Sequence, residues 1–404
     1  MNPFAPLVRH RNFRIFWSGQ TLSLVGTWMQ VMAEGWLALE LTNNAFLVGV
    51  VASAASLPVL LLSFIAGVVI DRVNRLRVVQ AMQALMLCQA TALWVLTLTG
   101  HLTIGWLIGL AFANGVFSAF EIPSRQSLVV ELVGREDLGS AIALNSSGFN
   151  LARVVGPALG AAVIAALGIA WCFAVNAASY LAVLVGLFMV RLPERERAAP
   201  KGSPLAGLQE GFAYIWHTPD VRALMTMVLV FSVFGVPYLT LMPVVARDLL
   251  GLGASGYGVL LAAVGVGGFA GALFIAGAGT RLPRTRTLVA ASALYAILLA
   301  VFSFVRWVPA ARALLLAIGF AMICNGALAN GLLQSRVPDV LRGRLMAAYS
   351  FAVVGMAQVA GSLMAGAVAR AAGAAWAIRG GSAVMLGYGL WEYAHRARRW
   401  SIDQ

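Results

Sequence analysis

The sequence predicts an all-α membrane protein in which twelve transmembrane helices form two six-helix pseudo-repeats. Of its 404 residues, 61% are hydrophobic and only 11% are charged, whereas soluble domains carry about 25% charged residues. Continuous apolar runs, such as residues 46–70, are long enough to cross about 30 Å of hydrocarbon. These runs lack the alternating pattern of a membrane β-barrel, so helices are the structure that satisfies the backbone in lipid.

Twelve apolar segments are expected to span the bilayer in chain order. Their approximate bounds are 13–39, 46–70, 78–99, 103–120, 140–166, 171–190, 222–246, 256–279, 287–306, 311–331, 345–370 and 374–393. With a cytoplasmic N-terminus, 22 of the 28 basic residues fall in inside segments and five in outside connections. Because short cytoplasmic loops carry an excess of Lys and Arg, both termini are expected in the cytoplasm.

A long, charged and proline-containing segment divides the chain into two halves. We predict an N-terminal half at 1–190, a cytoplasmic linker at 191–221 and a C-terminal half at 222–404. Three matches between the halves, at offsets of 209, 211 and 205, pair 71–77 with 280–286, 114–125 with 325–336, and 152–157 with 357–362. Paired six-helix halves are typical of transporters that rock about a midplane site.

Several other functions are disfavoured by composition. The net charge of +13 would suggest nucleic-acid binding on a soluble chain, but these arginines sit in short loops between spans. The three cysteines and four histidines are scattered without metal-ligand spacing. No GxxxxGK[ST] phosphate loop or nucleophile–base arrangement stands out. We therefore expect no enzyme activity, no cofactor, no metal and no nucleic-acid partner.

The turn after the second span concentrates charge in an otherwise apolar region. It contains Gly67, Asp71, Arg72, Arg75 and Arg77. Gly67 permits close helix approach, and Asp71 can face a positive helix N-terminus or pair with an arginine of a neighbouring loop. An ordinary positive-inside loop would explain the arginines but not Asp71.

Span five carries a stripe of small residues. Gly148, Ala152, Gly156 and Gly160 recur every four residues, a spacing that suits close helix packing. Pro157 adds a bend, because proline removes a backbone hydrogen bond. Ordinary helix packing would by itself account for the stripe.

The six-plus-six arrangement, the charged turn and the span-five sequence GPALG resemble the major facilitator superfamily. The closer likeness is to the exporter branch that contains the enterobactin exporter and related secretion effectors, carried by residues 13–42, 57–72, 122–133 and 143–160. The resemblance implies that the charged turn is a breakable cytoplasmic latch between the halves, and that GPALG accompanies export. The second copy has Thr280 where Asp71 would fall, so any latch there should be weaker.

Span one carries a polar stripe. Gln20, Ser23, Thr27, Gln30 and Glu34 project within about 80° of one another around a helix. Such a stripe is expected to face a wet cavity, because a charged side chain costs roughly 2.5–3.5 kcal/mol at the centre of a span. Glu34 is the candidate proton carrier. The other interpretation of Glu34 is a hydrated glutamate at the outer interface.

Further polar residues occur inside other spans. Asn150 and Arg153 share one face of span five, where Arg153 could bind an anionic substrate group or could be structural. In the fold that the chain resembles, spans one, four, seven and ten line the cavity. Asn114 and its repeat partner Asn325 are therefore expected lining residues, with packing beside the adjacent glycines as the alternative.

Together, these features favour a secondary active transporter: a proton-coupled exporter of small amphipathic molecules, of drug or siderophore type, working by alternating access. An importer or a lysophospholipid-type carrier on the same fold is the alternative, and a non-transporting membrane scaffold is a third hypothesis. The expected partners are a small-molecule substrate, protons and the lipid bilayer. We expect a monomer in a bacterial inner (plasma) membrane.

Overall fold

The all-α prediction is confirmed. The computed structural model describes residues 4–70, 73–134, 136–190, 204–278 and 283–400. In chain order the helices are α1 (Ala5–Arg9), α2 (Arg11–Thr42), α3 (Ala45–Ile70), α4 (Arg75–Leu98), α5 (Ile104–Val133), α6 (Leu138–Leu167), α7 (Ala170–Met189), α8 (Pro204–His217), α9 (Pro219–Phe234), α10 (Tyr238–Val244), η1 (Val245–Leu249), α11 (Ala254–Ala278), α12 (Arg284–Phe302), α13 (Val308–Ser335), α14 (Asp339–Ser350), η2 (Phe351–Gly361), α15 (Ser362–Ala372) and α16 (Ala374–Trp400).

These helices follow the twelve predicted spans in order. Spans seven and eleven are composite, because π-helical segments continue their α-helices: α9, α10 and η1 form span seven, and α14, η2 and α15 form span eleven. Within the described ranges, nine helices are long and apolar enough to cross a membrane by length and composition alone. We attribute the exclusion of α2 from those nine to its polar stripe, which lowers its mean hydropathy.

Local polar contacts set helix ends that hydropathy does not show. Asn43 adopts a φ of 49°, a non-helical conformation that separates α2 from α3. The Asn44 side chain then accepts a hydrogen bond from the backbone N–H of Phe46 at 3.0 Å, in the first turn of α3. The break between the first two spans therefore rests on two asparagines.

The fourth span is longer than predicted. The apolar stretch ends near residue 120, but α5 continues to Val133 and stops before Gly134, which has a φ of 70°. Such a backbone conformation favours glycine and is a common way to end a helix. The additional turns carry Glu121 and Arg125, so part of the region predicted as a loop is helix.

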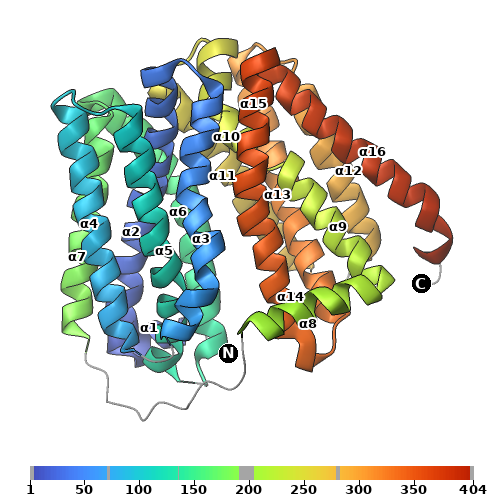
Figure 1. Cartoon of the computed structure of the whole chain (residues 1–404), viewed down its shortest axis with the longest axis horizontal. Helices are drawn as coiled ribbons and strands as arrows, with labels where there is room; N and C mark the ends of the chain where they lie inside the picture. The colour runs from blue at the N-terminus through green and yellow to red at the C-terminus, as the bar shows by residue number, and fades with distance from the viewer. Residues whose placement is uncertain (1–3, 71–72, 135, 191–203, 279–282, 401–404) are drawn as a thin grey trace. The chain divides into compact units, whose positions relative to one another are not determined.

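The chain forms two compact units. The first contains residues 1–42 and 54–204, and the second contains residues 43–53 and 205–404. Within the first unit α2 packs against α6 and α7, and α4 packs against α5 and α7; Figure 1 shows α4 and α7 side by side. One core cluster of this unit includes Phe13, Phe16, Leu128 and Leu187.

The second unit includes the helical part of the predicted linker. Residues 191–203 lie outside the described residues, and α8 follows them. Glu210 of α8 forms an ion pair with Arg344 of α14. The rings of Phe212 and Phe351 meet edge to face with centroids 6.1 Å apart. Through these contacts α8 packs on the start of span eleven.

The second unit depends on a close approach between α11 and α13. A Cβ atom on Gly319 would collide with the backbone carbonyl of Val264, and one on Gly267 would collide with that of Leu316. Small residues at such crossings let two membrane helices approach closely. Because backbone atoms are the obstacle at both positions, side-chain rearrangement cannot relieve the collision.

We therefore expect Gly319→Val to lower the free energy of unfolding by about 1–3 kcal/mol, the usual cost of overpacking. The measurement is thermal unfolding of the purified protein in detergent. Gly326→Val is the matched control, because it lies on the same helix and no described atom lies within 4 Å of its Cβ position. Equal melting temperatures for the two variants would contradict the packing argument.

Candidate functional site

The polar stripe of α2 faces other helices of the first unit. Gln20, Ser23, Gln30 and Glu34 are buried, with Gln30 only 2% and Glu34 only 6% exposed. This differs from the expectation of a wet cavity along the stripe. The physical reason is that α4 and α7 present polar side chains of their own to α2.

Gln30 is the centre of a buried amide network. Its Nε2 atom donates to Oε1 of Glu34 at 2.9 Å and to Oε1 of Gln89 at 3.1 Å. Its Oε1 atom accepts from Nδ2 of Asn176 at 2.7 Å. One side chain thus links α2 to α4 and α7 and fixes the position of the Glu34 carboxyl group.

Further hydrogen bonds extend this network to a fourth helix. Gln89 Nε2 donates to the Leu110 carbonyl of α5 at 3.3 Å. The Thr27 and Tyr180 hydroxyl groups lie 3.2 Å apart, between α2 and α7. We call Thr27, Gln30, Glu34, Gln89 and Asn176 the amide network. Gln30, Glu34, Gln89 and Asn176 are buried and Thr27 is half-buried, so the amide network lies in the interior of the first unit.

Gln89, Asn176 and Tyr180 were not among the predicted site residues. Each is an isolated polar side chain in an apolar helix, so no period or motif marks it. The available signal was the polar group itself, because a buried amide or hydroxyl inside a membrane requires a hydrogen-bond partner.

A second polar cluster lies on α4 and α5. Glu121 is only 4% exposed. Its Oε1 atom accepts from Nε of Arg125 at 2.9 Å and from Nε2 of Gln83 at 3.3 Å. Among the described atoms, Gln83 Oε1, Ser124 Oγ and Gln20 Oε1 are buried and have no hydrogen-bond partner.

The charged turn is described only in part. Asp71 and Arg72 lie outside the described residues. No described atom lies within 4 Å of the Cβ position of Gly67, so the described residues show no close helix approach at this glycine. Arg75 forms an ion pair with Glu131 of α5 at 2.6 Å, and Arg77 is exposed.

The small-residue stripe of span five packs against α2. Cβ atoms on Gly148, Gly156 and Gly160 would meet Thr21, Trp28 and Met32 respectively. Ala152 and Pro157 are also buried, and α6 continues through Pro157 from Leu138 to Leu167. The stripe therefore brings α6 close to the helix that carries the amide network.

Arg153 and Asn150 lie at the edge of the same α2–α6 contact. The Cζ atom of Arg153 lies 5.8 Å from the centroid of the Trp28 ring, within cation–π range. Asn150 Nδ2 donates to the Ser146 carbonyl of its own helix at 2.8 Å. The contact with the Trp28 ring is structural. Binding of an anionic substrate group by Arg153 stays a prediction.

The repeat partners Asn114 and Asn325 have different environments. Asn325 is buried, and its Nδ2 atom donates to Ser292 Oγ of α12 at 2.5 Å. In contrast, Asn114 Oδ1 is buried without a hydrogen-bond partner among the described atoms. Asn325 therefore links α12 and α13 within the second unit.

Long apolar helices that enclose buried amides and carboxyl groups define a multi-pass membrane protein. The solved structure of a D-xylose–proton symporter matches this fold with a TM-score of 0.73 at 13% identity, covering 94% of this chain and 97% of that one. A bacterial homologue of the human lysosomal transporter Spinster, in an inward-facing conformation, gives 0.70 at 14% identity, covering 97% and 96%. These likenesses establish the major facilitator fold.

The chain belongs to the transmembrane secretion effector family of the major facilitator superfamily, which it matches over residues 1–404. The multidrug efflux pump Tap of Mycolicibacterium fortuitum is 28% identical over 357 residues, covering 86% of this chain and 87% of the relative. The staphyloferrin A transporter of Staphylococcus aureus is 26% identical over 268 residues, covering 65% and 66%. The family is one of transporters and not an enzyme class.

Proposed function

We propose that this protein is a proton-coupled exporter of small amphipathic molecules. It works by alternating access, as a monomer in a bacterial inner membrane. Both termini lie in the cytoplasm. The two halves, 1–190 and 222–404, are joined by the linker 191–221. The observation that carries the proposal is the buried carboxyl group of Glu34, held by the Gln30 amide at 2.9 Å inside a membrane-spanning helix. The efflux and siderophore relatives support a small amphipathic substrate.

The amide network suits a group that gains and loses a proton. A carboxylate only accepts hydrogen bonds, whereas a carboxylic acid also donates one. The side-chain amides of Gln30, Gln89 and Asn176 each carry both donor and acceptor atoms, so reorientation of these amides can satisfy either form of Glu34. Ionisable residues within membrane helices commonly belong to proton relays.

Glu121 is less suited to carry the coupled proton. Its carboxylate pairs with the Arg125 guanidinium four residues along the same helix, at 2.9 Å. This hydrogen bond is charge-assisted and joins two side chains of one helix. We therefore assign proton coupling to Glu34 and a role in cytoplasmic gating to the pair formed by Glu121 and Arg125.

The charged turn is the second part of the proposed mechanism. Gly67, Asp71, Arg72, Arg75 and Arg77 would form a latch that breaks and re-forms in each cycle. The ion pair between Arg75 and Glu131 supports a charged contact at the start of α4. Arg153, Asn114, Asn150 and Asn325 remain proposed pathway residues.

We expect Asp71→Asn to slow transport about tenfold or more while the protein still folds, because the variant keeps the side chain's size but removes its charge. The measurement is substrate turnover by purified variants in proteoliposomes, with folding checked by size-exclusion profile. Asp220→Asn serves as the control, because Asp220 is an exposed aspartate at the start of α9, outside the charged turn. Wild-type turnover in Asp71→Asn would rule out the latch.

Direction and coupling are tested together in proteoliposomes with an imposed proton gradient, screened across dyes, antibiotics and siderophores. Export predicts uphill substrate movement away from the face that carries the termini, with protons moving the opposite way. Uphill movement toward that face would instead identify an importer. Absence of any gradient-driven flux across the panel would support a scaffold.

A further inference from the structure

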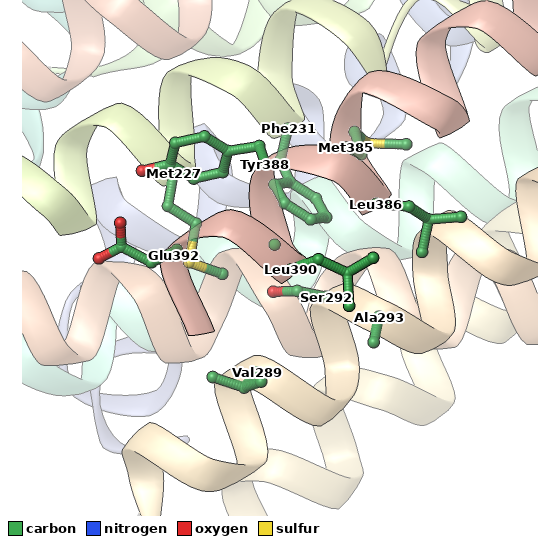
Figure 2. Close-up of a pocket in the computed structure, with 11 residues that line it drawn as sticks. Met227, Phe231, Val289, Ser292, Ala293, Met385, Leu386, Tyr388, Leu390 and Glu392 are labelled. Atoms are coloured by element: carbon green, nitrogen blue, oxygen red, sulfur yellow. The ribbon is translucent and has the colours of Figure 1, made fainter. Parts of the chain in front are cut away.

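A small pocket in the second unit lies between α9, α12 and α16. Figure 2 shows its apolar lining, which includes Phe231, Met385 and Leu386. Its volume of about 150 Å³ is below the roughly 300–1,000 Å³ of small-molecule sites. The pocket is therefore a packing gap between helices. The opposite ends of α12 and α16 carry charge that suits a ligand better.

Two short connections meet at those ends. Residues 303–307 join α12 to α13, and Gly373 joins α15 to α16. Arg379 of α16 donates from Nε to Ser303 Oγ at 3.1 Å and from Nη2 to the Ser303 carbonyl at 3.4 Å. Arg306 donates from Nη1 to the same carbonyl at 3.2 Å. The two guanidinium groups share one acceptor and therefore lie close together.

These two arginines lack an acidic partner. Between Asp248 and Glu392 the sequence contains a single acidic residue, Asp339. Asp339 begins α14, beyond the far end of the 28-residue helix α13. No carboxylate in the described part of the chain forms an ion pair with Arg306 or Arg379. Because two like charges repel one another at short distance, an anion bound between them would be stabilising.

Exposed aromatic rings surround the same arginines. The Cζ atom of Arg379 lies 3.9 Å from the centroid of the Phe304 ring and 4.9 Å from that of Trp376, within cation–π range. Phe304, Trp307 and Trp376 are all exposed. Exposed tryptophans at the ends of membrane helices are typical of the belt that lies at the level of the lipid headgroups. Arg306 and Arg379 are therefore expected at the depth of the lipid phosphates.

The position of this charge differs from the general distribution along the chain. Five of the 28 basic residues are expected in outside connections, and four of the five flank the two connections described here: Arg306, Arg312, Arg370 and Arg379. The bias of positive charge toward the cytoplasm does not account for them. Basic clusters beside membrane helices are typical of anionic-lipid recognition, and a guanidinium group matches the geometry of a phosphate.

We propose that Arg306 and Arg379 bind the phosphate group of an anionic phospholipid, such as phosphatidylglycerol. The hydrogen bonds to Ser303 engage two of the five N–H groups of Arg379, so the others can reach a phosphate. The exposed rings of Phe304 and Trp376 would contact the lipid below its headgroup. Binding does not depend on proton coupling. The proposed topology determines only the leaflet, which it makes the outer one.

The test is photocrosslinking of the full chain in nanodiscs of phosphatidylcholine that contain a trace of photoactivatable phosphatidylglycerol. Crosslinked peptides are mapped by mass spectrometry, so labelling of residues 303–312 and 370–380 is measured separately from other positions. We expect these two segments to be labelled. Unlabelled phosphatidylglycerol should compete with the labelling, whereas inorganic phosphate should not.

Arg379→Gln and Arg306→Gln should each lower labelling of these segments about fivefold, the effect of removing one basic residue near a lipid surface. Because Arg306 is exposed, Arg306→Gln tests the site even if Arg379→Gln fails to fold. Arg306→Lys keeps the charge and should keep most of the labelling. Arg286→Gln is the matched control, since it removes an exposed arginine from the opposite end of α12 and should leave these segments labelled as in the wild type.

Three results would overturn the proposal. Unchanged labelling in folded Arg379→Gln and Arg306→Gln would leave Arg379 as a cation–π contact that holds α16 on α12. Equal competition by inorganic phosphate would identify a site for free anions. Equal labelling by a photoactivatable phosphatidylcholine would show that the surface does not select charge. None of these results bears on the exporter mechanism, and failure of that mechanism would leave the lipid site intact.

Discussion

Glu34→Gln should abolish gradient-driven accumulation of substrate while leaving substrate binding and folding intact. The substitution preserves the size of the side chain and its hydrogen bond with Gln30, but an amide cannot exchange the coupled proton. We expect uphill flux to fall about tenfold or more, whereas downhill exchange of substrate should persist. The measurement pairs substrate uptake with proton movement in the same proteoliposomes.

The matched control is Glu40→Gln, because Glu40 lies on the same helix and is exposed. This variant removes one carboxylate from α2 outside the amide network, so flux should stay at the wild-type level. An unchanged number of protons per substrate in Glu34→Gln would show that Glu34 is not the carrier. Loss of coupling in Glu121→Gln instead would transfer the assignment to the second polar cluster.

The sequence predicted the helices well because membrane burial leaves a strong local signal. Apolar runs of about 20 residues locate spans without knowledge of their neighbours. The small-residue stripe on α6 is equally local, and the structure confirms close packing of Gly148, Gly156 and Gly160 against α2. A feature that is determined by the residues of a single helix can therefore be predicted from the sequence.

The candidate site was only half visible, because its other half comes from distant segments. The α2 stripe follows one helical period, but its partners Gln89 and Asn176 are 59 and 146 residues from Gln30. Repeat symmetry was also an incomplete guide, since Asn325 is hydrogen-bonded to Ser292 while its counterpart Asn114 has a buried oxygen without a described partner. Tertiary context determines both outcomes.

Tertiary context also accounts for the composite structure of span eleven. A π-helical segment widens the backbone turn without changing composition, so hydropathy could not show that Phe351–Gly361 differs from the helices on either side. Ser53 Oγ donates to the Val359 carbonyl of this segment at 3.0 Å. The start of α3 therefore contacts an irregular part of span eleven that no sequence pattern marked.

The contact between the start of α3 and span eleven leads to the second large prediction. Within the second unit, Gly49 packs so closely that a Cβ atom would collide with the Ser362 carbonyl, and a Cβ atom on Gly366 would make a tight contact of 3.0 Å with the Ala45 carbonyl oxygen. Arg247 adds a hydrogen bond to Asn43 at 2.5 Å. Because residues 54–70 of the same helix belong to the first unit, alternating access should require this contact to open and close.

Gly49→Leu should therefore hold the contact open and reduce transport about tenfold or more. Overpacking against backbone costs about 1–3 kcal/mol, which shifts a two-state equilibrium about 5-fold to 150-fold. Gly109→Leu is the matched control, because Gly109 is exposed and no described atom lies within 4 Å of its Cβ position. The measurement is gradient-driven flux for both variants.

An independent readout follows the contact itself. In a protein whose Cys88, Cys172 and Cys324 are replaced by serine, a cysteine substituted for Ser53 reports opening, because Ser53 is only 5% exposed. Gly49→Leu should raise labelling of this cysteine by a membrane-impermeant thiol reagent, and Gly109→Leu should not. If Gly49→Leu transports normally and labelling stays low, the contact between α3 and span eleven accommodates the leucine without opening. The start of α3 would then be a fixed part of the second unit throughout the cycle.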